Sequence, residues 1–261
     1  MEIIKSKDNP KVKRLALLHD RKKASKEGVV FIEGTRLCED AIISGVVPSM
    51  IACTEMRYEG VAALLKKHDI NCEINVFSDE CFVKICSTVN PQGVAMIVES
   101  PKNPETLPYR GDGKDIYVVL EKLQDPGNLG TIIRLADAFD FTAVIMTKGT
   151  CDPYNEKVLR SSMGSIWHIP LITYDNSEEI ISALKEKGVS LIATELHGDL
   201  LNEAKINLPA AYFVGNEGNG LLESTISSCD TRVKIPMPGK AESLNAASAA
   251  SIMGYVLASK R

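Results

Sequence analysis

The sequence predicts an α/β protein built from two domains, and three observations lead to this prediction. Short apolar runs alternate with amphipathic helical patterns along most of the 261 residues. Residues 100–113 interrupt this alternation with three prolines and two glycines. A chain of this length, 44% hydrophobic, is long enough to bury a core on each side of the interruption.

The first domain, residues 1–99, has the pattern of a small α/β domain. The expected strands are residues 29–33, 50–54, 73–77 and 93–98, and the expected helices are residues 35–44, 57–68 and 79–85. Residues 100–114 are then predicted to be the linker between the domains, because proline and glycine break both periodicities.

The second domain, residues 115–261, opens with the order strand, glycine turn and helix that is typical of the ligand-facing end of an α/β sheet. The expected strands are residues 116–120, 143–146, 189–194 and 211–214, and the expected helices are residues 131–139, 156–163, 178–187, 220–228 and 243–260. We predict a mostly parallel sheet with helices on both faces. The last helix is rich in Ala, Ser and Gly, so another backbone can lie close against it.

Charge is distributed unevenly along the chain. The net charge is −4, yet residues 1–27 hold nine Lys or Arg against four acids, which is about +5 and leaves about −9 for the remainder. A basic N-terminal arm on an acidic body suits local contacts with phosphates, although a solvated, frayed terminus would have the same composition. The residues proposed to make these phosphate contacts are Lys11, Lys13, Arg14 and Arg21.

The cysteines and the N-terminus point to a compartment. Seven cysteines without a C-x-x-C pair suit reduced thiols in the cytosol better than disulfides or a metal site. The N-terminus has no apolar signal region, and no apolar run approaches the ~20 residues of a membrane helix. We expect a soluble, cytoplasmic protein.

A nucleotide-binding, Rossmann-like domain would fit the order of strands and helices, but the spacing of the glycines does not fit its phosphate-binding motifs. The turn Gly127-Asn-Leu-Gly130 lacks the G-x-G-x-x-G spacing, and the chain has no G-x-x-x-x-G-K-[ST] phosphate loop. In Gly215-Asn-Glu-Gly218 an acid stands where a pyrophosphate would approach.

Three motifs in the second domain carry a more specific signal. Asn128-x-Gly130-x-x-x-Arg134, Gly215-x-Glu217-Gly-x-Gly220, and Ile235-Pro-Met-x-Gly239 followed by Ser243-Leu-Asn245 occur in this order. Together they resemble the signature motifs of the SpoU/TrmH family of RNA ribose 2′-O-methyltransferases, in the SPOUT class. In the first domain, Ile4-x-Ser6-x-x-Asn9-Pro10-x-Val12-Lys13 and Phe31-Ile-Glu33-Gly34 are similar to the RNA substrate-binding domain of the longer members, a ribosomal-protein-like fold.

The resemblance implies a fold and a cofactor. Members of the class thread the C-terminal segment through a loop to form a trefoil knot, which is a rare exception among protein chains, and they pack as homodimers. The cofactor is S-adenosylmethionine, held largely by backbone groups. The positions that this implies for cofactor binding are Thr194, Gly215, Ile235, Met237 and Leu244.

The resemblance also implies the catalytic residues, which are Arg134, Asn128, Glu217, Ser243 and Asn245. Arg134 either accepts the proton of the ribose hydroxyl or clamps an RNA phosphate, and arginine is an unusual base because its guanidinium is normally charged. The spacing puts Asn128 in the turn before a helix and Arg134 in the first two turns, so that both would face one cavity. Ser243 and Asn245 are also good helix caps.

The substrate is less sharply predicted than the reaction. An N-terminal domain of this size resembles members that act on large ribosomal RNA, so 23S rRNA is favoured over tRNA, and housekeeping and antibiotic-resistance roles remain open. A catalytically silent RNA-binding or ribosome-assembly protein is the alternative of another class. It would have no reason to keep all five catalytic positions, so their presence favours the enzyme.

Overall fold

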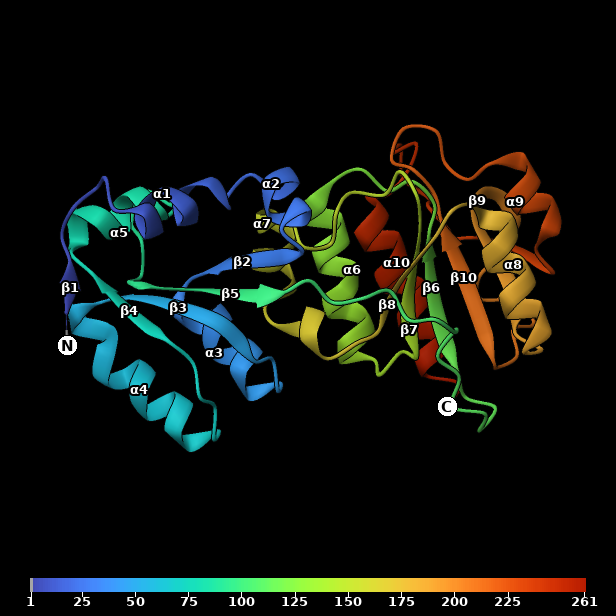
Figure 1. The fold of residues 1–261 in the computed structure, drawn as a ribbon. Helices are drawn as coiled ribbons and strands as arrows, with labels where there is room; N and C mark the ends of the chain where they lie inside the picture. Colours follow the sequence, from blue (N-terminus) through green and yellow to red (C-terminus); the bar gives the residue numbers. More distant parts are fainter. Residues whose placement is uncertain (1) are drawn as a thin grey trace. The chain divides into compact units, whose positions relative to one another are not determined.

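The computed structural model describes residues 2–261 and divides the chain into two compact units, one ending at Lys102 and the other spanning Asn103–Arg261 (Figure 1). Each unit has its own sheet and its own core. In the described part of the chain, no helix is long and apolar enough to cross a membrane.

The first unit is a five-stranded mixed sheet in the order β1-β4-β3-β5-β2. Its strands are β1 (Ile3–Ile4), β2 (Val29–Glu33), β3 (Pro48–Thr54), β4 (Ile74–Phe77) and β5 (Val94–Glu99). Its helices are α1 (Pro10–Leu17), α2 (Arg21–Lys26), α3 (Thr35–Ile43), α4 (Tyr58–Lys67) and α5 (Asp79–Ile85), with a 3-10 turn at Glu55–Arg57. Strand β5 runs antiparallel to β2 and β3, whereas β3, β4 and β1 are mutually parallel. The predicted α/β pattern of this half is confirmed, and β1, α1 and α2 are additions to it.

The basic N-terminal segment is not an arm. It folds into α1 and α2 because Val12, Leu15 and Leu18 recur at helical spacing, and all three are at most 2% exposed. They join the core of the first unit together with Phe77 and Phe82. The prediction of an arm is wrong because it was based on the many charges of this segment and overlooked its short apolar stripe.

The second unit is a six-stranded sheet in the order β11-β9-β10-β6-β7-β8, and all its strand pairs are parallel. Its strands are β6 (Ile116–Leu120), β7 (Ala143–Thr147), β8 (Leu171–Tyr174), β9 (Ser190–Leu200), β10 (Ala210–Val214) and β11 (Thr231–Lys234). Its helices are α6 (Pro126–Ala138), α7 (Glu156–Ser162), α8 (Ser177–Glu186), α9 (Glu223–Ser228) and α10 (Ala246–Ala258), with a 3-10 turn at Ser165–Trp167. Helices α6 and α10 cover one face of the sheet, and α8 and α9 cover the other (Figure 1). The predicted parallel sheet with helices on both faces is confirmed.

Helix α6 begins five residues earlier than predicted. Asp125 is its N-cap and accepts a hydrogen bond from the Asn128 amide at 2.8 Å, and Pro126 occupies the first turn, where a proline needs no hydrogen-bond partner. Asn128 is therefore inside the helix rather than in a turn before it. Six residues along a helix correspond to a rotation of about 240° between Asn128 and Arg134, so they cannot share a face.

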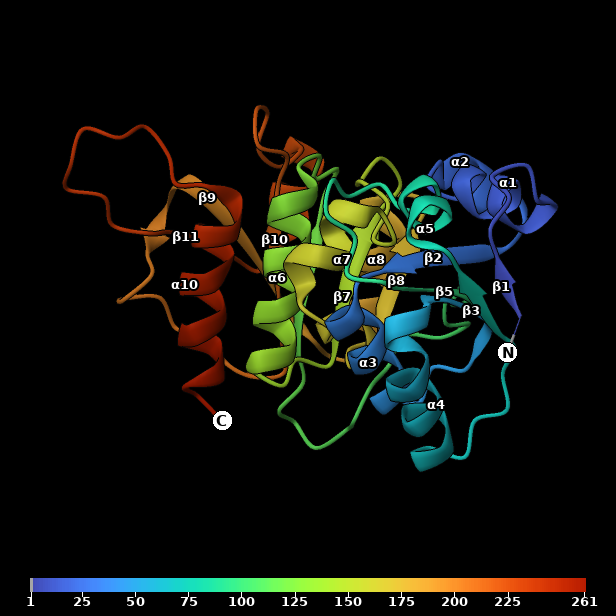
Figure 2. The same cartoon turned by 90° about the vertical axis from the view of Figure 1, so that its left-hand side faces the viewer.

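Helix α10 packs parallel to α6, and the two lie side by side in both views (Figure 2). Asn245 is the N-cap of α10 and accepts hydrogen bonds from the amides of Ala247 and Ser248. Ser243 precedes the helix and does not cap it. A Cβ added to Gly254 of this helix would meet the side chains of Phe141, Tyr212 and Leu135.

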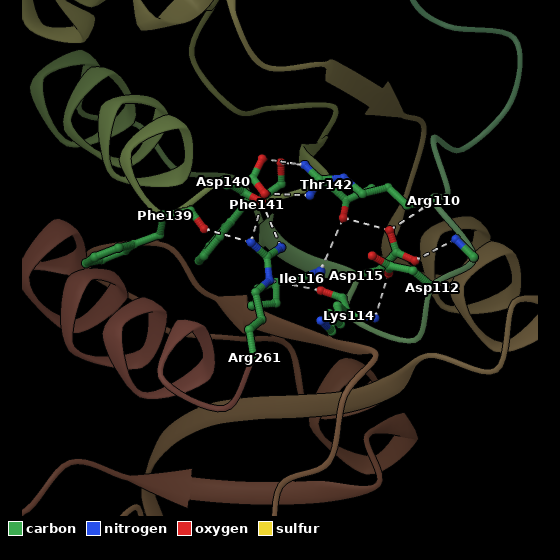
Figure 3. Close-up of polar contacts among 11 residues, drawn as sticks. Arg110, Asp112, Lys114, Asp115, Ile116, Phe139, Asp140, Phe141, Thr142 and Arg261 are labelled. Atoms are coloured by element: carbon green, nitrogen blue, oxygen red, sulfur yellow. Dashed lines mark hydrogen bonds and ion pairs between the residues drawn. The ribbon is translucent and has the colours of Figure 1, made fainter.

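Most of the predicted linker is fastened to the second unit. Leu107 is buried in the core of that unit, and Tyr117 Oη donates a hydrogen bond to the carbonyl of Pro108 at 2.8 Å. The guanidinium of Arg110 donates to both carboxylate oxygens of Asp140 at 2.7 Å (Figure 3). From Asn103 onward, the segment is therefore part of the second unit.

Candidate functional site

A cavity of about 640 Å³ lies beside the carboxyl end of β10. It is formed by three stretches that are far apart in the sequence, within residues 194–197, 214–221 and 235–249, together with Ile226. Its volume is in the range of small-molecule sites. The predicted site residues that line it are Thr194, Gly215, Glu217, Ile235, Met237, Ser243, Leu244 and Asn245.

The loop after β10 has no room for a side chain at its first residue. A Cβ on Gly215 would lie 2.1 Å from the carbonyl carbon of Gly220, because the loop turns back on itself. Two backbone hydrogen bonds between Asn216 and Gly220, at 3.0 and 2.9 Å, hold this turn. The cavity wall here is therefore main chain.

One polar atom in the cavity wall has no partner. The hydroxyl oxygen of Thr194 is buried and makes no hydrogen bond within the described residues. A buried hydroxyl without a partner costs about 1–3 kcal/mol, and a polar ligand in the cavity would remove that cost. The site therefore fits a small ligand that carries hydrogen-bonding groups.

Glu217, at the tip of the loop, connects the second motif to the first. Its carboxylate accepts hydrogen bonds from the amides of Gln124 and Asp125 and from Asn128 Nδ2, all at 3.0 Å. Burial raises the pKa of the Glu217 carboxyl, but these hydrogen bonds outweigh burial and hold the pKa below its ordinary value. The carboxylate therefore fixes the orientation of the Asn128 side chain.

Asn128 in turn connects the first motif to the third. Its Oδ1 accepts a hydrogen bond from Asn245 Nδ2 at 2.8 Å. The orientation of Asn245 follows from its cap, because its oxygen is occupied by helix amides and only its NH₂ group can face Asn128. Glu217, Asn128 and Asn245 thus form one hydrogen-bonded chain across all three motifs.

Arg134 lies apart from this chain. It is exposed on α6, it does not line the cavity, and it makes no ion pair or hydrogen bond within residues 2–261. Asn128 does not line the cavity either, so the expectation that both face it is wrong. The guanidinium is accessible to a ligand approaching from outside.

The four residues proposed to contact RNA are all engaged within the first unit. Lys11 pairs with Glu73 at 2.7 Å, Lys13 with Asp8 at 2.9 Å and Arg14 with Glu27 at 2.9 Å, and Arg21 donates to the carbonyl of Val29 at 2.8 Å. Exposed ion pairs of this kind are worth little, so phosphates can exchange for the carboxylates.

Sequence reasoning missed other cavity residues, including Glu195, His197 and Glu242. We expected the strand to end at Thr194, whereas β9 continues to Leu200, and residues 195–200 show no apolar alternation. The only available signal was that Glu195 follows a predicted site residue directly.

Comparison with known families matches both units. Residues 115–255 match the SpoU rRNA Methylase family, and residues 9–96 match the MRM3-like substrate binding domain. The first match covers more than half of the chain and includes all three motifs.

Individual relatives cover nearly the whole chain. It is 34% identical to the 23S rRNA (guanosine(2553)-2′-O)-methyltransferase RlmP of Bacillus subtilis, over 98% of this chain and 99% of the relative. An AdoMet-bound rRNA methyltransferase from Sinorhizobium meliloti superposes with a TM-score of 0.86 at 30% identity, covering 98% of this chain and 97% of that one. AviRb from Streptomyces viridochromogenes, also solved with AdoMet, gives 0.85 at 26% identity, with 97% and 98% covered.

Proposed function

The chain belongs to the SpoU rRNA methylase family, and from this premise we propose that it methylates a ribose 2′-oxygen of 23S rRNA with S-adenosylmethionine. One observation carries the proposal. Residues of the second and third motifs converge on a single cavity, and a hydrogen-bonded chain through Glu217, Asn128 and Asn245 joins its rim to the first motif.

The cavity is the proposed cofactor site. Its unpartnered Thr194 hydroxyl, the main-chain wall at Gly215 and the apolar side chains of Ile235, Met237 and Leu244 suit a ligand with both polar and apolar parts. When bound, S-adenosylmethionine would supply the methyl group of its sulfonium to the ribose 2′-oxygen, which gives up its proton, and S-adenosylhomocysteine would be the leaving group. The cavity walls would fix the orientation of the cofactor relative to the ribose.

Arg134 is the proposed contact with the reacting nucleotide. Its exposed guanidinium is available to clamp an RNA phosphate or to take the proton of the 2′-hydroxyl, and both roles remain open. Asn128 and Asn245, held in one orientation by Glu217, would position the ribose. Ser243 at the cavity rim is the remaining proposed catalytic position.

We also propose that the protein is a cytoplasmic homodimer with a trefoil knot in its second unit. Helix α10 exposes Ile252 and Tyr255, which are 38% and 64% accessible, on a helix otherwise rich in small residues. Exposed apolar side chains on such a helix suit a self-complementary interface. Sedimentation that gives a monomer at micromolar concentration would contradict the dimer.

The experiment for the reaction is transfer of labelled methyl groups from S-adenosylmethionine to total rRNA and tRNA, followed by mapping. Label in 23S rRNA at a ribose is the expected result, with Arg134→Ala as the matched control. Label in tRNA alone would show that the substrate is tRNA and not 23S rRNA. If the protein binds RNA but labels neither RNA, the result would support the alternative of a catalytically silent RNA-binding or ribosome-assembly protein.

A further inference from the structure

A buried carboxylate outside the three motifs holds the wall of the cavity. Glu121 follows β6 directly and is 2% exposed. Its side chain accepts hydrogen bonds from the Leu222 amide at 2.7 Å, from the Thr225 hydroxyl at 2.6 Å and from the Ser177 hydroxyl. All three partners donate to the side chain of Glu121, so its two oxygens act only as acceptors.

The main chain of Glu121 contacts the other end of the same wall. Its amide donates a hydrogen bond to the carbonyl of Val214 at 2.9 Å. Val214 and Leu222 flank residues 215–221, and every one of those seven residues lines the cavity. One residue therefore fixes both ends of the loop that forms this wall, although it does not line the cavity itself.

The middle of the loop is fastened to the residues that follow Glu121. Asn216 Nδ2 donates to the carbonyl of Lys122 at 2.9 Å, and Glu217 accepts from the amides of Gln124 and Asp125. Because the turn at Gly215 leaves no free space, small displacements of either end must be passed on to the wall.

We infer that Glu121 is a positioning residue that sets the shape of the cofactor cavity by holding the 215–221 loop closed. The inference rests on the proposed function for the identity of the ligand, and on the contacts of Glu121 alone for the closure of the loop. It requires that loss of the Glu121 carboxylate loosens the loop and weakens S-adenosylmethionine binding while the sheet stays folded.

The chemistry of the contacts predicts which substitutions are tolerated. In Glu121→Gln the amide oxygen can still accept from Leu222, and the NH₂ group can donate to the two hydroxyls, which reverse their roles. In Glu121→Ala three donors lose their acceptor, and the buried ones carry the cost of desolvation. The conservative variant should therefore rescue what alanine removes.

The test measures hydrogen exchange of peptides covering residues 213–222 in the ligand-free protein, and calorimetric binding of S-adenosylmethionine, below the unfolding temperature of each variant. Glu121→Ala should speed exchange in this loop and weaken binding, each by at least ~10-fold, as expected for loss of a hydrogen bond to a charged group. Glu121→Gln should stay within ~3-fold of the wild type in both measurements, because its contacts are re-formed.

A second pair of variants keeps the inference testable if Glu121→Ala does not fold. Leu222→Pro removes the amide donor at a residue whose φ of −66° is already that of proline, whereas Leu222→Ala keeps the donor and shortens a side chain that is 47% exposed. Loop exchange and cofactor affinity should change with proline and not with alanine.

Two outcomes would overturn the inference, and a third concerns only the proposed function. Wild-type loop exchange in Glu121→Ala or Leu222→Pro would show that the contacts do not hold the loop. Lower thermal stability with unchanged cofactor affinity would make Glu121 merely structural. If the wild type bound no S-adenosylmethionine, the proposed function would fail, while the exchange data would still decide whether Glu121 closes the loop.

Discussion

The side chain of Asn245 donates a hydrogen bond to Asn128 at 2.8 Å, although 117 positions separate the two residues. Asn245 starts α10 and Asn128 lies in the first turn of α6, so this bond connects the starts of two parallel helices. Because Asn128 is also held by Glu217, a change at any of the three residues should be felt by the other two.

Replacing Arg134 should separate catalysis from cofactor binding. Arg134→Ala should lower methyl transfer by at least ~10² if the guanidinium takes part in the proton step. S-adenosylmethionine affinity should be unchanged, because Arg134 does not line the cavity. Single-turnover transfer and calorimetry on the same preparation check both statements, and Arg134→Lys tells a point charge from a planar donor. Turnover near the wild-type rate would remove Arg134 from the site.

Replacing Gly215 should damage the cavity wall directly. The Cβ in Gly215→Ala would fall within 2.4 Å of three backbone atoms, so the loop must shift, at a cost of about 1–3 kcal/mol. Gly60→Ala is the matched control, because its Cβ would meet nothing within 4 Å and the helix should gain about 0.5–1 kcal/mol. Unfolding temperatures and cofactor affinity should fall only in the first variant. Equal behaviour of the two would show that the loop has room to move.

Glu217 should make the stability of the second unit depend on acid pH. Its folded pKa lies below its ordinary value, so its contribution is present above pH ~4.5 and is lost as the pH falls through the folded value. The difference in unfolding temperature between wild type and Glu217→Gln should therefore be constant near neutral pH and shrink below pH ~4.5. Thermal scans across this range test it. If the difference in unfolding temperature grew in acid instead, folding would raise the pKa of Glu217 rather than lower it.

Arg261 should stabilise the second unit mainly through backbone carbonyls. Its guanidinium donates to the carbonyls of Lys114, Phe139 and Asp140 (Figure 3), and its side chain is 18% exposed. Arg261→Ala should therefore cost about 1–2 kcal/mol of unfolding free energy. Arg36→Ala, which removes a 77% exposed arginine lying 3.8 Å from Asp40, should cost nearly nothing. Calorimetric unfolding of both variants provides the comparison.

The basic residues of α1 should contribute to RNA binding through phosphates. Replacing Lys11, Lys13 and Arg14 with Ala should weaken binding across many RNA sequences and flatten its salt dependence by up to ~0.7–0.9 for each phosphate contact that is lost. These cations have acidic partners in the free protein, so the salt slope should decrease by less than the loss of three full phosphate contacts would give. Affinity at several salt concentrations measures this. An unchanged salt slope would show that RNA lies elsewhere.

The sequence predicted most elements of both sheets, because buried parallel strands are plain apolar runs. The prediction failed at segments where the types of residue indicate one element and their hydrophobic periodicity indicates another or none. The predicted helix begins at residue 131, although Pro126 directly after the cap residue Asp125 is a good helix start. The apolar stripe of α1 was concealed by its charges, and the extension of β9 has no alternation to read.

The site was predicted unevenly for a related reason. Resemblance identified eight of the residues that line the cavity, because most of them belong to motifs that are local in sequence. Contacts such as that between Asn245 and Asn128 depend on how distant segments meet, and no spacing encodes them. Glu121 carries no pattern at all, since a single acid after a strand is normally exposed, and only its burial reveals it.

The ties between α6 and α10 place a limit on how this protein can vary. Asn245 joins Asn128 at one end of the pair, and Arg261 joins Phe139 and Asp140 at the other. A single residue inserted into α10 would rotate everything beyond it by about 100° and shift it by about 1.5 Å. One of the two ends would then miss its partner. A change in the length of an exposed loop elsewhere would leave both ties in place, whereas a change in the number of residues in α10 would break one of them.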